Sequence, residues 1–176
     1  MLERFYPDEY LESVDDIDFD MYYKQGIRGI ISDIDNTLVP HGAPATEHIV
    51  KLFERIHDMG IDTCLISNNQ EPRVEPFAYA VNSKYIFNAH KPSTKNYINA
   101  MKLMGTDAAS TLFIGDQIFT DVWGANRAGI QTVMVKQIDK KEEIQIVLKR
   151  IPEKFVLWRW RKKLEKRESS GSEVNK

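Results

Sequence analysis

From residue 27 onward the sequence alternates short apolar segments with segments of helical periodicity, and this alternation restricts the fold more than any other feature. One helical segment begins at the capping residue Thr46 and ends at Gly60, with Ile49, Phe53 and Ile56 on one face. Strands that alternate with helices at these intervals join through right-handed crossovers into a parallel sheet. The sequence therefore predicts an α/β fold, with a doubly wound, mainly parallel, Rossmann-like sheet. The expected strands are residues 27–33, 61–67, 85–88, 111–115 and 131–135, and further helices are expected over 72–80, 93–105 and 122–129.

The length and the charge distribution indicate one domain with a distinct segment at each end. A chain of 176 residues suits one compact domain, which we predict to span residues 1–150. Residues 1–26 are acidic but contain several aromatic side chains, so we expect them to form an arm of short helical turns packed on this domain. Residues 150–168 carry eight Lys or Arg against three Glu, whereas residues 1–149 hold a net charge of −7. We therefore expect residues 151–176 to form a basic, amphipathic C-terminal tail.

The overall composition excludes several classes of protein. A formal net charge of −2 excludes a generally basic nucleic-acid binder, so no nucleic acid partner is expected. The sequence has no window of about 18 apolar residues, and residues 1–25 are acidic, so we expect neither a membrane span nor a signal peptide. Cys64 is the only cysteine, which rules out an internal disulfide and fits a reducing, cytoplasmic location.

Two carboxylates stand where the first expected strand ends. Asp33 and Asp35 are one residue apart, and alternate residues of a strand point the same way, so both side chains can face one spot. Two carboxylates that close repel each other unless a cation lies between them or one takes a proton. The pair therefore predicts a chemical site in the crevice outside the carboxyl ends of the strands.

The other strands also end in polar side chains, which a parallel sheet would bring to the same edge. These are Ser67 and Asn68 after the second strand, Lys91 after the third, and Asp116 with Asp121 after the fourth. Oxygen ligands of this kind suit Mg²⁺, while a lysine and a serine can hold the remaining oxygens of a phosphate. One carboxylate can attack phosphorus and its neighbour can transfer the proton, so we predict phosphate-ester chemistry with Mg²⁺ as cofactor.

Four segments in this order resemble the motifs of the haloacid dehalogenase (HAD) superfamily of phosphatases. The segments are Asp33-Ile34-Asp35-Asn36-Thr37, Ser67, Lys91-Pro92 and Gly115-Asp116-Gln117-Ile118-Phe119-Thr120-Asp121, and the resemblance covers residues 27–136. It implies an aspartyl-phosphate mechanism in which Asp33 is both the nucleophile and a metal ligand. Asp35 would be the general acid and base, with its backbone carbonyl on the metal, and Asp116 would be a further Mg²⁺ ligand.

The same resemblance implies roles for the remaining site residues. Ser67 and Lys91 would bind the transferred phosphoryl group, with Asn68 beside them. Thr37 would brace the first loop, and Asp121 would assist through a metal-bound water or by orienting Lys91. Many members of the superfamily carry a cap domain over the site. Here the connections after the first motif and between Ser67 and Lys91 are too short for one, so we expect a capless enzyme and a substrate whose bulk stays outside.

The chain is similar to the YqeG-like phosphatases of HAD subfamily IIIA in three further features. It is short, it has Tyr6-Pro7-Asp8 near its beginning, and Gly26-Ile27-Arg28-Gly29 leads into the first expected strand. This closer resemblance implies a lipid headgroup as substrate, namely phosphatidylglycerophosphate, which is converted to phosphatidylglycerol. Two alternatives remain open at this point: a phosphatase of another bulky substrate such as a phosphoprotein, and a non-catalytic phosphate-binding module.

The basic tail allows two interpretations as well. Leu157, Trp160 and Leu164 share a helical face, and Lys and Arg fill much of the rest of residues 155–167. Tryptophan with clustered basic residues is typical of a helix lying on an anionic membrane, here the inner face. The alternative is a terminal helix that packs its tryptophans on the domain and leaves its cations in solvent.

Overall fold

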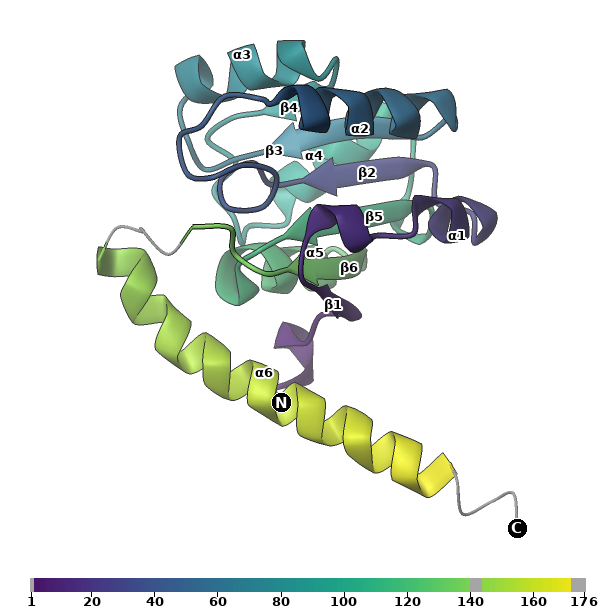
Figure 1. The fold of residues 1–176 in the computed structure, drawn as a ribbon, viewed down its shortest axis with the longest axis vertical. Coiled ribbons are helices and arrows are strands. Elements are labelled where there is room, and N and C mark those ends of the chain that lie inside the picture. The colour runs from purple at the N-terminus through teal and green to yellow at the C-terminus, as the bar shows by residue number, and fades with distance from the viewer. Residues whose placement is uncertain (1, 140–143, 172–176) are drawn as a thin grey trace.

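The computed structural model describes residues 2–139 and 144–171, with side chains described for residues 2–139 and 152–166. Six strands form one sheet in the order β1-β6-β5-β2-β3-β4, and every strand pair in the described residues is parallel (Figure 1). The predicted α/β fold with a doubly wound parallel sheet is therefore confirmed. The strands are β1 (Glu9–Leu11), β2 (Gly29–Ser32), β3 (Asp62–Ile66), β4 (Lys84–Ile86), β5 (Thr111–Gly115) and β6 (Gln131–Val135).

Helices cover both faces of the sheet. Buried side chains of α1, α2 and α3 pack on one face, and those of α4 and α5 pack on the other, so two hydrophobic layers enclose the central strands. The α-helices are α1 (Phe19–Lys24), α2 (Glu47–Asp58), α3 (Glu71–Ala80), α4 (Lys95–Met104), α5 (Trp123–Arg127) and α6 (Ile144–Gly171). Shorter turns are η1 (Glu3–Phe5), η2 (Val14–Asp16), η3 (Ala108–Ser110) and η4, a π-helical turn (Ile118–Val122).

The helix start signals were only partly informative. The Thr46 hydroxyl accepts a hydrogen bond from the Ile49 N–H at 3.3 Å, as a capping residue should. The predicted cap at Ser93 is wrong, because the Ser93 N–H bonds to the His90 carbonyl at 2.9 Å and the chain is still turning there. Helix α4 instead begins after Thr94, whose side chain makes no capping bond.

The N-terminal arm contains the expected short helical turns and also a strand that the sequence did not predict. β1 pairs in parallel with β6, and the Asp8 carboxylate next to it accepts the Thr132 N–H at 2.7 Å. A three-residue strand carries too short a pattern to stand out, and it forms here because β6 offers an unpaired edge. The arm is thus part of the sheet.

The connections that could have held a cap are short. Between β2 and α2 the chain forms a loop, and between β3 and β4 it forms only α3. The carboxyl ends of β2 and β3 consequently open toward solvent without a covering domain in the described residues.

Helix α6 packs against η4 and the N-terminal arm. Val156 is buried with Ile118, Val122 and Met134, and the ring of Trp160 lies 6.5 Å from that of Tyr10. The boundary predicted at residue 150 falls inside this helix, and the last residues of the predicted tail, 172–176, lie outside the described residues. None of the helices in the described residues is both long and apolar enough to cross a bilayer.

Candidate active site

The carboxyl ends of four strands bring the predicted residues close together, and Asp33, Asp35, Ser67 and Lys91 among them line a cavity of about 210 Å³. Asp33 and Asp35 follow β2, Ser67 follows β3, Lys91 follows β4, and Asp116 and Asp121 follow β5. All six residues are buried. The residues that line the cavity are Asp33, Asp35, Asn36, His41, Ser67, Asn68, Asn69, Lys91, Gln117 and Thr120.

Lys91 lies between two carboxylates. Its ammonium is 2.7 Å from Asp33 Oδ1 and 2.7 Å from Asp121 Oδ1, and its side chain is only 4% exposed. Burial alone would lower the pKa of Lys91, but the carboxylates of Asp121 and Asp33 outweigh that effect and hold the pKa above its usual value. The lysine is therefore a fixed positive charge at the floor of the cavity.

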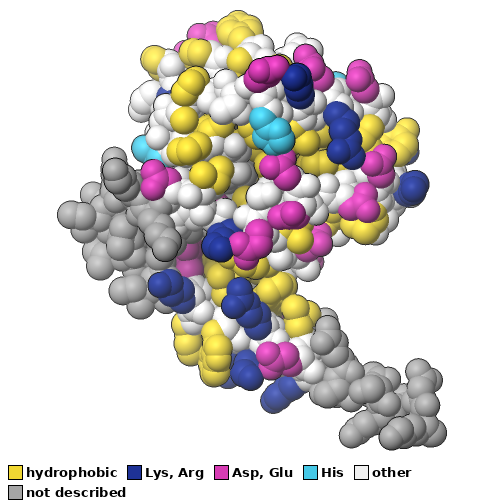
Figure 2. Space-filling model, in the orientation of Figure 1, with side chains coloured by type: hydrophobic (Ala, Val, Ile, Leu, Met, Phe, Trp, Pro, Cys, Tyr) yellow, Lys and Arg dark blue, Asp and Glu magenta, His cyan; other side chains and the backbone are white. Residues whose placement is uncertain are grey.

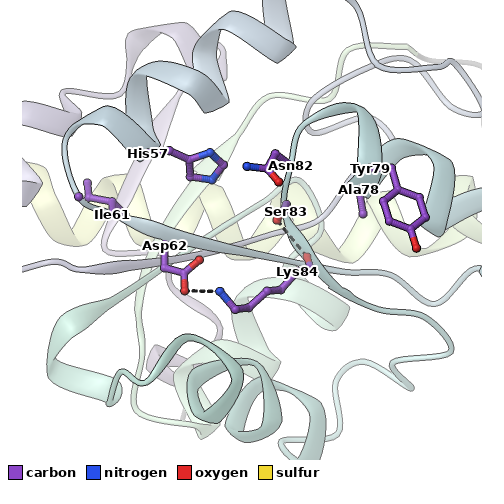
Figure 3. A pocket seen from close by; sticks show the side chains of 9 residues that line it. His57, Ile61, Asp62, Ala78, Tyr79, Asn82, Ser83 and Lys84 are labelled. Atoms are coloured by element: carbon purple, nitrogen blue, oxygen red, sulfur yellow. Dashed lines mark hydrogen bonds and ion pairs between the residues drawn. The ribbon is translucent and has the colours of Figure 1, made fainter.

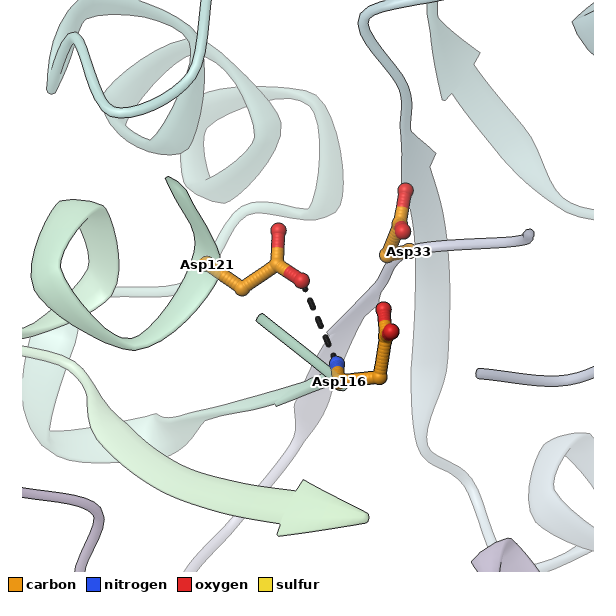
Figure 4. Close-up of side chains that lie close together, drawn as sticks. All are labelled: Asp33, Asp116 and Asp121. Atoms are coloured by element: carbon orange, nitrogen blue, oxygen red, sulfur yellow. Dashed lines mark hydrogen bonds between the residues drawn. The ribbon is translucent and has the colours of Figure 1, made fainter. Parts of the chain in front are cut away.

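Three buried carboxylates lie close together here, and two of them, Asp33 and Asp121, contact the Lys91 ammonium. Oxygen atoms of Asp33, Asp116 and Asp121 all lie within 4.8 Å of one another, and Figure 4 shows the three side chains around a common space. Burial raises the pKa of Asp33 to about 6, with repulsion from Asp121 adding to the rise and Lys91 opposing it. The buried negative charge exceeds the positive charge of Lys91, and an oxygen-ligated divalent cation would balance the difference. The donor set therefore fits a metal ion.

The loop after β5 is held in place by Asp121. Its Oδ2 accepts the backbone N–H groups of Asp116 and Gln117 at 3.2 and 3.1 Å, while its Oδ1 accepts from Lys91. A Cβ on Gly115 would lie 2.7 Å from the Asp121 side chain, so only glycine allows this close approach. The Thr37 hydroxyl, 3.2 Å from Asp116 Oδ1, ties the loop after β2 to the same carboxylate.

Asp35 is held by donors that the sequence analysis did not identify. Arg73 Nη2 donates to Asp35 Oδ1 at 2.8 Å, the Gly42 N–H donates to the same oxygen at 2.7 Å, and Asn69 Nδ2 donates to Oδ2 at 2.8 Å. Burial works to raise the pKa of Asp35, but the bonds from Arg73 and Gly42 outweigh it and bring the pKa below its usual value. Asp35 is consequently held as a carboxylate.

One signal in the sequence points to Arg73. It lies in the first turn of α3, where the helix dipole mildly disfavours a cation, so its basic side chain is a weak signal of an acidic partner. Its guanidinium also lies 5.5 Å from the Phe77 ring centre, which fixes its direction.

Ser67 and Asn68 both line the cavity but also support its backbone. The Ser67 hydroxyl accepts the Asn69 N–H at 3.1 Å. The Asn68 side chain bonds to both backbone groups of Lys91, with its Oδ1 accepting the N–H at 2.7 Å and its Nδ2 donating to the carbonyl at 3.3 Å. Asn68 thereby positions Lys91, and contact of Ser67 and Asn68 with phosphate remains a prediction.

Glu153 joins α6 to the loop after β5. This glutamate is 4% exposed, and its Oε1 accepts the Ile118 N–H at 2.8 Å, two residues after Asp116. It was missed because one of the three acids in the mostly basic segment 150–168 gives no signal of a contact this distant in sequence.

A larger cavity, of about 570 Å³, lies at the opposite edge of the sheet, where β3 and β4 begin (Figure 3). Its charged side chains, Asp62 and Lys84, form an ion pair with each other and are partly exposed. None of the residues predicted to carry chemistry lines it.

The chain is similar to known proteins in sequence. A family model described as haloacid dehalogenase-like hydrolase matches residues 41–129, which include Ser67, Lys91, Asp116 and Asp121. The chain is 36% identical over 137 residues to "Probable phosphatase YqeG" of Bacillus subtilis, covering 77% of this chain and 80% of that protein. It is 25% identical over 158 residues to "Phosphatidylglycerophosphate phosphatase 1, chloroplastic/mitochondrial" of Arabidopsis thaliana, covering 84% of this chain but only 45% of that protein.

Solved structures show the same fold at low sequence identity. An uncharacterized protein from Listeria monocytogenes aligns with a TM-score of 0.51 and 17% identity, covering 66% of this chain and 85% of the other. One from Corynebacterium glutamicum aligns with a TM-score of 0.52 and 22% identity, covering 65% of this chain and 89% of the other. Together with the family match and the likeness to YqeG over most of both chains, these findings confirm the expected family: the chain belongs to the haloacid dehalogenase-like hydrolases.

Proposed function

We propose that this protein is a Mg²⁺-dependent phosphomonoester hydrolase that acts through an aspartyl-phosphate. The observation that carries the proposal is the buried cluster of Asp33, Asp116 and Asp121 at the carboxyl ends of the strands, in which Asp33 and Asp121 also contact Lys91. An excess of buried negative charge beside one fixed ammonium suits a cation together with a phosphate. The relatives named as phosphatases support the same chemistry.

In the first half-reaction, an Asp33 oxygen attacks the phosphorus and the bond from phosphorus to the alcohol oxygen breaks. Lys91 and Ser67 hold the non-bridging oxygens, and Asp35 gives a proton to the departing alcohol oxygen. Asp33, Asp116 and the Asp35 carbonyl would hold Mg²⁺, which supplies charge stabilisation of the phosphoryl oxygens. In the second half-reaction, Asp35 takes a proton from water, the water oxygen attacks phosphorus, and Asp33 is released as a carboxylate.

The hydrogen bonds to Asp35 suit the second of these steps. Arg73 holds Asp35 as a carboxylate, the form that accepts a proton from water. The first step needs the protonated acid. A dianionic phosphate arriving beside Asp35 raises the pKa of the carboxyl by repulsion, and the proton is then available for the departing alcohol. Arg73 thus sets the balance between the two forms.

We propose phosphatidylglycerophosphate as the substrate and phosphatidylglycerol as the product. The open cavity supports a substrate whose bulk remains outside, as a phospholipid in a bilayer would. The Arabidopsis relative is named for this lipid phosphate. A lipid substrate would place the enzyme at a membrane surface on the cytoplasmic side.

Phosphate release from a panel of substrates tests the function. Purified protein with Mg²⁺ is given phosphatidylglycerophosphate in vesicles, a phosphopeptide, a sugar phosphate and an aryl phosphate. We expect the lipid to be hydrolysed with the highest kcat/KM, and Asp33→Asn to remove all turnover. Preference for the phosphopeptide would overturn the lipid assignment, and an absence of turnover on every substrate would indicate a phosphate-binding module.

A further inference from the structure

One side of α6 carries an exposed pair of aromatic side chains. Phe155 and Trp158 are 55% and 52% exposed, and their ring centres lie 5.9 Å apart. The helix already buries its other side, where Val156, Leu157 and Trp160 pack on the domain. The exposed pair therefore lies on the face opposite to the one that holds α6 in place.

Cationic side chains surround this pair. Figure 2 shows Lys and Arg side chains next to hydrophobic ones along the described part of α6. Beside them Arg159, Lys162, Lys163 and Lys166 line a cavity of about 460 Å³ together with residues of the N-terminal arm. The exposed cations of residues 152–166 are Lys154, Arg159, Arg161, Lys162 and Lys166, against the exposed acid Glu165.

We propose that this surface, which we call the α6 outer face (Lys154, Phe155, Trp158, Arg159, Lys162), binds the surface of an anionic phospholipid bilayer. Its charge is opposite to that of the lipid, and its aromatic rings can enter the boundary between headgroups and acyl chains. The lipid is favoured over a nucleic acid because the chain as a whole carries a net charge of −2 and its excess of basic residues is confined to this helix. The value of such binding to catalysis rests on the proposed lipid substrate.

The helix that carries this surface is connected to the candidate active site. In Figure 1, α6 begins on the side of the sheet toward which β2 and β3 point, which is the edge that holds the site. Glu153, one residue before Lys154, bonds to the Ile118 N–H next to the Asp116 loop. A bilayer bound at the α6 outer face would therefore be held by the same helix that contacts the catalytic loop.

Vesicle co-sedimentation of the full chain tests this surface. The vesicles contain phosphatidylcholine and phosphatidylserine in equal parts, and so offer anionic charge without any phosphomonoester. Phe155→Ser/Trp158→Ser removes the aromatic pair. The matched control, Ile98→Ser/Leu103→Ser, removes two apolar side chains of α4 with similar exposure, 41% and 52%. Thermal unfolding of each variant checks that the fold is retained.

We expect the full chain to bind these vesicles and not pure phosphatidylcholine, and added salt to weaken the binding. The α6 double variant should bind roughly tenfold more weakly, because interfacial binding scales with the apolar area inserted, while the α4 control binds as the natural chain does. Equal binding by both variants, or no binding by the natural chain, would overturn the proposal. If the natural chain binds RNA as tightly as vesicles, and if the α6 double variant binds both as tightly as the natural chain does, the surface binds polyanions in general and the proposal is overturned.

These outcomes are separate from those that test the proposed function. Vesicles without a phosphomonoester report binding alone, whereas phosphate release from phosphatidylglycerophosphate reports catalysis. Hydrolysis of the lipid by a chain that does not bind phosphatidylserine vesicles would contradict only the surface. Vesicle binding without lipid hydrolysis would contradict only the substrate.

Discussion

Each of the two edges of the sheet carries a cavity, and the two cavities differ in the burial and balance of their charged side chains more than in their volume. The larger one holds an ion pair, Lys84 with Asp62, whose side chains are 41% and 38% exposed. At the smaller one Lys91 and its partner Asp121 are 4% and 0% exposed, Asp33 also contacts the ammonium, and Asp116 lies close to both carboxylates. An exposed pair is neutral and screened by water, and contributes little free energy. Buried, unbalanced charge is costly to keep, which is why we place the chemistry in the smaller cavity.

The largest expected difference between the two cavities is in turnover. Asp33→Asn should lower kcat on an aryl phosphate by at least about 1,000-fold, because an amide cannot serve as the nucleophile. Asp62→Asn, the matched change in the larger cavity, should leave kcat within about twofold. Steady-state kinetics with Mg²⁺ measure both. Activity retained in Asp33→Asn would contradict the nucleophile assignment.

The second largest expected difference between the two cavities is in the response of the protein to Mg²⁺. Mg²⁺ should raise the unfolding midpoint of the natural chain and of Asp62→Asn, because a ligand that binds only the folded state stabilises it. In Asp116→Asn this rise should be absent and kcat should be roughly 100-fold lower, since a ligand to the cation is missing. Scanning calorimetry with Mg²⁺ or with a chelator gives the comparison. A full Mg²⁺ response in Asp116→Asn would remove this residue from the metal site.

A smaller effect on kcat is expected when Arg73, which bonds to Asp35, is replaced. Arg73→Gln should lower kcat roughly tenfold at neutral pH, because a general acid and base loses its orientation. Without the guanidinium the pKa of Asp35 rises, so the limb of the pH profile that belongs to this group should move to higher pH. Arg73→Lys should restore part of that shift. A pH profile of kcat/KM unchanged by Arg73→Gln would show that Arg73 acts only on structure.

The smallest effect concerns stability without metal. The folded protein binds a proton on Asp33 more tightly than the unfolded chain does, since the pKa rises from 3.8 to about 6. The contribution of this group to stability is therefore present below pH 3.8 and is lost as the pH rises through about 6. Asp33→Asn, which stays uncharged, should flatten this part of the curve of unfolding midpoint against pH. An identical curve for the variant would show that Asp33 is not buried as a charge.

The sequence was sufficient for the sheet and for most of the site because both follow local patterns. Apolar segments gave five of the strands, and the residues just past their ends, such as Asp33, Ser67 and Lys91, had to meet at one edge of a parallel sheet. The contacts that it did not reveal depend on packing between segments far apart in sequence. Arg73 reaches Asp35 across 38 residues, and Glu153 reaches Ile118 across 35.

The tail shows the same limit in another form. Its periodicity placed Leu157, Trp160 and Leu164 on one face. The structure packs Leu157 and Trp160 on the domain, but Leu164 is 39% exposed. The exposed face instead holds Phe155 and Trp158. The periodicity did not predict this, because residues 155–158 are all apolar and so do not define a single apolar face.

The strand contributed by residues 9–11 has a consequence for how the protein behaves at high concentration. β6 would otherwise present a row of open peptide groups at the margin of the sheet, and such margins recruit strands from neighbouring molecules. By occupying that margin with a strand of three residues in place of the five of β6, the arm leaves a shorter template for self-association.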